Sequence, residues 1–168
     1  MKFIRDLVAQ IKKAGSIDAS KVYATGLSNG GSMSHTLACE AADVFTATAP
    51  VSFTLSGGSN VNAIKRNCTP SEPIPVIHFH GKSDELVNYN RGILDAIGAE
   101  DSLKAWVDIQ KCSASAQTTT LLPCTTCKTH TCAGGVEVAM CAVDGGAHVL
   151  HPLQALLLPG PASLNPNF

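Results

Sequence analysis

The chain has 168 residues, of which 45% are hydrophobic and 15% are charged, and its formal net charge at pH 7 is −1. This composition is typical of a globular domain with a buried core, and it excludes a disordered or strongly charged tail. Because the sequence has no run of basic residues and no apolar segment of ~18 residues, we expect neither nucleic acid nor a membrane as partner. No signal peptide is recognisable in the chain.

Strands and helices alternate along the predicted chain. Hydrophobic periodicity and turn residues predict helices over 3–14, 30–41 and 100–110, and strands over 21–25, 45–51, 75–80 and 136–143. Loops are predicted over 54–63, 81–98 and 112–134, the last of them rich in cysteine. The alternation predicts an α/β fold with about four mostly parallel strands and with helices on both faces of the sheet.

The most informative motif is the pentapeptide at 26–30, Gly-Leu-Ser-Asn-Gly, which follows a predicted strand and precedes a predicted helix. Strand, tight turn and helix are the context of a nucleophile elbow, in which the hydroxyl of Ser28 is exposed at the apex of a strained turn. The following helix would direct the backbone N–H of Asn29 at a developing oxyanion. The alternative is a Gly/Ser-rich turn with no catalytic role.

A serine nucleophile of this kind needs an acid and then a histidine, in that order along the chain. Asp84 follows the predicted strand 75–80, and His148 follows the predicted strand 136–143. His148 would take the proton of Ser28, and Asp84 would hold the imidazole in the correct tautomer. Asp144 is a competing acid, but it lies only four residues before His148 and has little room to reach behind the ring, so we favour Asp84.

These motifs resemble the polyhydroxybutyrate depolymerase and feruloyl esterase family of secreted α/β-hydrolases. The resemblance spans about residues 3 to 150, and it is carried by the stretches 22–33, 37–40, 49–51, 73–81 with Asp84, and 143–148. It implies an ester hydrolase with Ser28, Asp84 and His148 as its triad. It also implies secretion, several disulfides and no cofactor.

The chain departs from the family pattern at both ends. Family members begin well before residue 1, so the resemblance implies a single domain over 1–168 that is the C-terminal half of an α/β-hydrolase sheet and lacks the N-terminal strands. The absent part would carry the second oxyanion N–H. Near the other end, Ala147 replaces the expected glycine, no tryptophan follows His148, and 156–166 does not match the expected closing helix. We therefore expect a truncated chain.

The seven cysteines are numerous for a cytosolic protein and indicate an oxidising compartment. Cys39 and Cys68 are placed to join the helix after the elbow to the segment before the strand of the acid. The pairing of the other cysteines is not deducible, and one thiol must remain. The alternative is a structural zinc site within the segment 124–132, where three cysteines and His130 lie close together. The family resemblance favours disulfides, so we expect no metal.

Three further histidines need an interpretation. His78 and His80 lie two apart on a predicted strand and therefore face the same side of the sheet. They could form a metal pair, but buried, hydrogen-bonded histidines are the favoured interpretation. His35 lies on the helix after the elbow and is expected to pack only, and Trp106 is expected in the core.

The sequence therefore predicts a serine carboxylic ester hydrolase that acts through an acyl-Ser28 intermediate. Polyester, feruloyl and acetyl ester substrates remain open. The alternative is a catalytically weak or inactive remnant that serves as a disulfide-tied structural or binding domain. Because the strand 21–25 would be a bare sheet edge and the helix 3–14 would keep an exposed apolar patch, we also expect a homodimer.

Overall fold

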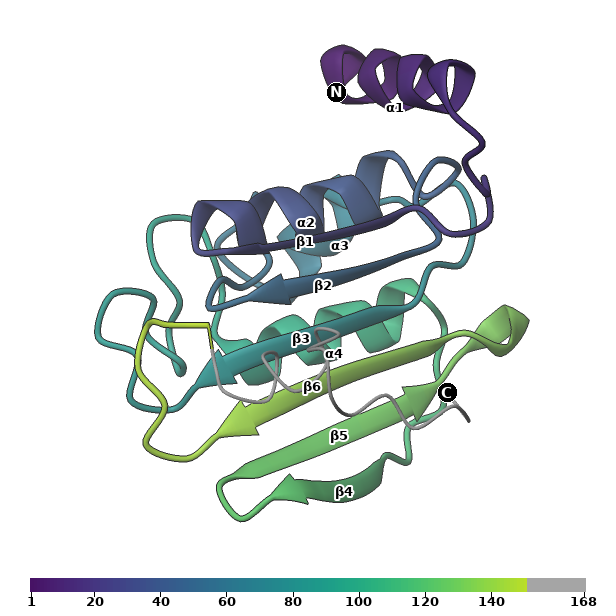
Figure 1. Ribbon diagram of the computed structural model, residues 1–168. Coiled ribbons are helices and arrows are strands. Elements are labelled where there is room, and N and C mark those ends of the chain that lie inside the picture. Colours follow the sequence, from purple (N-terminus) through teal and green to yellow (C-terminus); the bar gives the residue numbers. More distant parts are fainter. Residues whose placement is uncertain (151–168) are drawn as a thin grey trace.

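The computed structural model describes residues 1–150 as a twisted sheet with four helices (Figure 1). The helices are α1 (Lys2–Ala14), α2 (Asn29–Glu40), α3 (Val61–Asn67) and α4 (Ala99–Ile109), with a short 3₁₀ turn at Ala133–Gly135. The strands are β1 (Tyr23–Leu27), β2 (Ala47–Val51), β3 (Val76–Gly81), β4 (Gln117–Leu122), β5 (Thr125–Thr131) and β6 (Glu137–Val143). The predicted helices and strands are all present, with ends shifted by a few residues.

The sheet has six strands in the order β1-β2-β3-β6-β5-β4, so the prediction of about four strands was too low. The first four strands in this order are parallel, whereas β5 is antiparallel to both β6 and β4. The prediction of a cysteine-rich loop over 112–134 was wrong, because this segment forms the β4–β5 hairpin. Its strands are rich in β-branched threonine, which favours a pleated surface although it is polar.

A second difference lies between β2 and β3, where α3 begins at Val61, inside the predicted loop 54–63. The side chain of Asn60 accepts a hydrogen bond of 3.0 Å from the backbone N–H of Ala63 and so caps this helix. The sequence prediction missed α3 because it has only two turns, which is too short for a clear hydrophobic period.

Within residues 1–150, α2, α3 and α4 pack on the same face of the sheet, not on both faces (Figure 1). The strand order explains this arrangement. From β1 through β2 and β3 to β6, each parallel strand is added on the same side of the previous one, and right-handed crossovers then all pass over one face. The main core cluster lies between these helices and the strands, and its largest fully buried side chains are those of Trp106, Ile64, Ile74, Leu55 and Met140.

The predicted edge position of the first strand is confirmed for the described chain, since β1 pairs with β2 alone. Tyr23 at its start is 62% exposed. The helix α1 has no fully buried residue and is held by Arg5, whose guanidinium lies 2.6 Å from the carboxylate of Asp43. Phe3 on this helix is 73% exposed. No helix within residues 1–150 is long and apolar enough to cross a bilayer.

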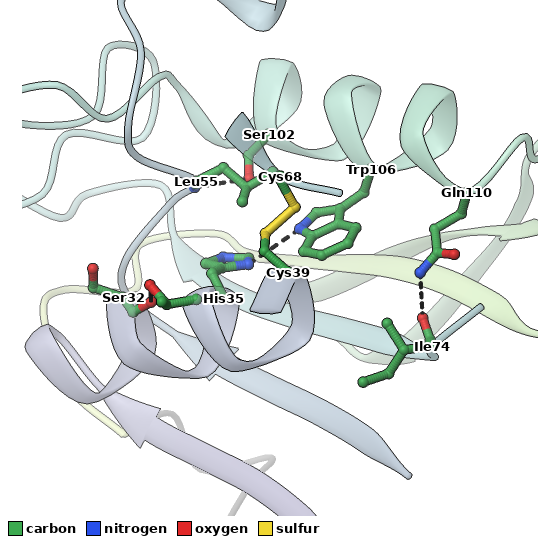
Figure 2. The surroundings of a disulfide bond; sticks show 10 residues. Ser32, His35, Cys39, Leu55, Cys68, Ile74, Ser102, Trp106 and Gln110 are labelled. Carbon is green, nitrogen blue, oxygen red and sulfur yellow. Dashed lines mark hydrogen bonds between the residues drawn. A yellow bond between two sulfur atoms is a disulfide. The ribbon is translucent and has the colours of Figure 1, made fainter. Parts of the chain in front are cut away.

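Three disulfides connect these elements: Cys39–Cys68, Cys112–Cys132 and Cys127–Cys141. The first confirms the predicted link from the helix after the elbow to the segment before β3, and Figure 2 shows it beside the core tryptophan. The third joins two residues that face each other across β5 and β6. Cys124 is the remaining thiol and is exposed. The disulfides use two cysteines of the alternative zinc site, which opposes that alternative.

Candidate active site

The turn after β1 has the geometry of a nucleophile elbow. Ser28 has φ 58° and ψ −118°, a conformation that a residue with a side chain rarely adopts. The turn is held by two backbone hydrogen bonds, from the N–H of Ser28 to the carbonyl of Val51 at 3.0 Å and from the N–H of Ser32 to the carbonyl of Ser28 at 2.9 Å. These bonds hold Ser28 in its strained conformation, half-buried at the end of the strand.

Asp84 lies three residues after β3 and is fully buried, with a side chain that has 0% exposure. Its Oδ1 accepts hydrogen bonds from the backbone N–H groups of Leu86 at 2.9 Å and Val87 at 2.8 Å. Its Oδ2 lies 2.8 Å from Nδ1 of His148. A buried carboxylate must find partners, and these contacts satisfy both of its oxygens.

His148 follows β6 on a loop that is bonded to the loop of Asp84. The N–H of Lys82 donates to the carbonyl of Val143, and that of Ser83 donates to the carbonyl of Gly146, both at 2.9 Å. The competing acid Asp144 is exposed and forms an ion pair with Lys82 at 2.6 Å. The carboxylate in contact with His148 is therefore that of Asp84.

Ser28, Asp84 and His148 each follow the carboxyl end of a parallel strand, namely β1, β3 and β6. Such strand ends share one edge of the sheet, where α/β proteins bind their ligands. The structure joins His148 to Asp84 by a hydrogen bond, but within residues 1–150 no hydrogen bond joins Ser28 to His148. Asn29 is the first residue of α2, so its N–H has no partner inside that helix. The residues 151–168, which include the unusual 156–166, lie outside the described residues.

No family model matches the sequence, but comparison with known proteins finds similar chains. The chain is 32% identical over 162 residues to feruloyl esterase B of Piromyces equi, an alignment that covers 88% of this chain and 28% of that protein. It is 30% identical over 122 residues to the bifunctional acetylxylan esterase/xylanase XynS20E of Neocallimastix patriciarum, covering 73% of this chain and 16% of that protein. These similarities confirm the resemblance to feruloyl esterases that the sequence motifs indicate.

Solved structures show the same fold at low sequence identity. The acetyl xylan esterase from Aspergillus awamori superimposes with a TM-score of 0.64 at 14% identity, covering 93% of this chain and 65% of that chain. A variant of Arabidopsis thaliana SOBER1 superimposes with a TM-score of 0.56 at 16% identity, covering 94% and 59%. The chain thus spans less than a third of the length of the two sequence relatives described above, and about two thirds of the first structure.

The chain also contains a buried group of histidines near the candidate site. His78 and His80 on β3 are buried and hydrogen-bonded to each other at 3.2 Å, which confirms the favoured interpretation of this pair. His35 does more than pack, because its Nδ1 accepts a hydrogen bond of 3.1 Å from the indole N–H of Trp106 (Figure 2). Burial lowers the pKa of His35 to about 3 and holds the pKa of His78 well below its usual value.

Sequence reasoning missed the groups that hold the acid in place. It identified Asp84, but not the two backbone donors at Leu86 and Val87. It identified His80 as buried, but not the contact of 2.8 Å between its Nε2 and the carbonyl of Val87. An aspartate that accepts from backbone N–H groups two or three residues later forms an Asx turn, a common loop pattern that could have indicated the two backbone contacts.

The close packing of the elbow predicts opposite effects for its two glycines. A Cβ at Gly26 would lie 2.6 Å from the backbone of Gly30, whereas a Cβ at Gly30 would meet nothing within 4 Å. We expect Gly26→Ala to lower the free energy of unfolding by about 1–3 kcal/mol. As the matched control, Gly30→Ala should leave it unchanged or raise it by up to about 1 kcal/mol, because position 30 is helical. Urea unfolding followed by circular dichroism measures both, and equal effects would contradict the packing described here.

The depressed pKa of His35 predicts a loss of stability in acid. Its pKa is about 3 in the folded chain and 6.5 ordinarily, so between these values only the unfolded chain binds the proton. The free energy of unfolding should therefore fall as pH decreases from 6.5, by about 1.4 kcal/mol per pH unit for this residue. Urea titrations between pH 7 and 4 should show a shallower pH dependence in His35→Gln. Thr36→Ala, on the same helix, should keep the dependence of the original chain.

Proposed function

We propose that the protein is a serine carboxylic ester hydrolase with Ser28, Asp84 and His148 as its catalytic residues. The observation that carries this proposal is the 2.8 Å contact between His148 Nδ1 and the buried carboxylate of Asp84. This contact lies at the same edge of the sheet as the strained elbow of Ser28. The similarity to feruloyl and acetylxylan esterases supports ester hydrolysis as the reaction.

The proposed mechanism follows from the contacts of His148. Its Nδ1–H donates to Asp84, so Nε2 is left as the base that accepts the proton of the Ser28 hydroxyl. The serine oxygen attacks the ester carbonyl, and His148 then passes the proton to the leaving alcohol. Water, activated by the same imidazole, hydrolyses the acyl-Ser28 intermediate. This reaction uses side chains and water and needs no cofactor.

The backbone N–H of Asn29 is the proposed oxyanion donor, at the positive end of α2. A second donor is not identified among residues 1–150. Loss of one such donor lowers the rate by about 10²–10³-fold in known enzymes, so a triad with a single donor can still turn over. The substrate class proposed here is a feruloyl, acetyl or polyester ester, because the chain is similar to esterases that bear the first two names.

The second candidate is an inactive or weakly active remnant that serves as a disulfide-tied structural or binding domain. The observations in its favour are the missing hydrogen bond between Ser28 and His148 within residues 1–150 and the single oxyanion donor. Under either function we propose one domain over 1–168 and an extracytoplasmic location. The three disulfides support that location, since they form and persist in oxidising compartments.

Covalent labelling and turnover distinguish the two functions. The chain should hydrolyse a short p-nitrophenyl ester and gain one adduct from an organophosphonate probe, detected by intact mass. Ser28→Ala should abolish the adduct and lower kcat by about 10³-fold or more, and His148→Ala should slow both reactions. Ser32→Ala, four residues along the same helix, is the matched control and should keep both. Labelling that persists in Ser28→Ala would exclude Ser28 as the nucleophile.

We also propose that the chain forms a homodimer through β1. Within residues 1–150 this strand pairs on one side only, and Tyr23 at its start is exposed. Bare strand edges pair readily with another chain. Light scattering over a dilution series should give twice the mass of the 17.4 kDa chain. Tyr23→Lys should shift the equilibrium towards the monomer, whereas Leu94→Lys, at an exposed loop position, should not. A monomer at all concentrations would contradict the proposal.

A further inference from the structure

We propose that His80 is a positioning residue for the catalytic acid: its imidazole holds the loop 84–87 so that Asp84 meets His148, and a chain of buried polar groups fixes the imidazole in turn. This role deepens the proposed function and rests on it. His80 would act through Val87, with which it forms a hydrogen bond.

The backbone of Val87 is held from both sides. Its backbone N–H donates to Oδ1 of Asp84 at 2.8 Å, and its carbonyl lies 2.8 Å from Nε2 of His80. The side chains of Asp84 and His80 both have 0% exposure. The distance from His80 Nε2 to Asp84 Oδ2 is 3.6 Å, which is too long for a hydrogen bond, so the 2.8 Å hydrogen bond of this nitrogen is with the loop.

The contact with Val87 determines the tautomer of His80. A carbonyl oxygen only accepts hydrogen bonds, so the contact with Val87 requires the proton on Nε2 of His80. In the neutral ring, Nδ1 is then an acceptor, and it lies 3.2 Å from Nε2 of His78, which must donate. The hydrogen bonds therefore all run in one direction: His78 donates to His80, and His80 donates to the loop that carries Asp84.

The ring of His78 packs in turn against His35. The ring of His35 contacts that of His78 edge to face, with centroids 5.3 Å apart. His35 is oriented at both nitrogens, because Trp106 Nε1 can only donate to its Nδ1 at 3.1 Å and the carbonyl of Phe53 can only accept from its Nε2 at 3.3 Å. Figure 2 shows the indole N–H directed at the imidazole. The rings of this group thus lie between α4, α2 and β3, which are rigid elements.

The geometry explains why the acid needs this help. Asp84 follows β3 on an irregular loop, and in the segment 82–98 the structure has only an isolated bridge between Asn88 and Gly92. The carboxylate fixes the N–H side of Val87, but it cannot fix its own position by that bond alone. His80 anchors the carbonyl side of the same residue to β3. Rotation of the loop would have to break both bonds.

Two polar substitutions of His80 separate positioning from packing. The amide nitrogen of His80→Gln reaches about as far as Nε2 and can donate to the Val87 carbonyl, whereas the shorter amide of His80→Asn cannot. The readout is the low-field imidazole N–H proton resonance of His148 bonded to Asp84, assigned by its loss in Asp84→Asn. We expect this resonance in the original chain and in His80→Gln, and its loss or upfield shift in His80→Asn. This measurement does not depend on turnover.

Kinetics give the second readout. We expect His80→Asn to lower kcat by about 10–100-fold with little change in KM, and His80→Gln to restore most of it. Ile64→Val, a fully buried change on α3, is the control for reduced core stability and should leave the resonance unchanged. An unshifted resonance and kcat in His80→Asn, or equal defects in both His80 variants, would overturn the positioning role. If Ser28→Ala keeps its turnover, the proposed function fails, while the resonance still decides the role of His80.

Discussion

The arrangement of the candidate site depends on one buried carboxylate. A charged group without water costs several kcal/mol unless it is fully paired, so the fold must supply partners to Asp84. The partners come from two segments of the chain: the backbone of Leu86 and Val87 lies on one side, and the imidazole of His148, 64 residues away in sequence, lies on the other. The same requirement brings the loop after β3 against the loop after β6. Gly81 allows this approach, because a Cβ there would lie 2.1 Å from the carbonyl of Gly146.

The register of the parallel strands places the two loops side by side. β3 and β6 are in register over six consecutive residue pairs, so their carboxyl ends and the loops that follow them are level. The antiparallel hairpin β4–β5 and the disulfide Cys127–Cys141 then support β6 from the side away from β3. In this way a polar, threonine-rich hairpin that carries no predicted chemistry stabilises the strand from which His148 is presented.

Much of this could be predicted from the sequence, because the signals were local. The elbow is defined by five adjacent residues, and β3 and β6 are apolar runs that end in a turn with Asp84 and His148. The hairpin could not be predicted in the same way, since its strands lack an apolar period and exist because β6 offers them a paired edge. The pairing of Cys127 with Cys141 depends on that register. The contact of His80 with Val87 depends on how an irregular loop folds back, which no residue spacing determines.

The backbone of Ser28 bears on which proposed function the fold favours. Its strained conformation costs about 1–3 kcal/mol and persists only where neighbouring contacts enforce it. Here the enforcing contacts are made by Val51 and Ser32, together with the close approach of Gly26 to Gly30. A turn that served only to connect β1 to α2 would gain nothing from this strain. A turn that must present a hydroxyl above the sheet requires it, so the conformation favours a nucleophile over a structural remnant.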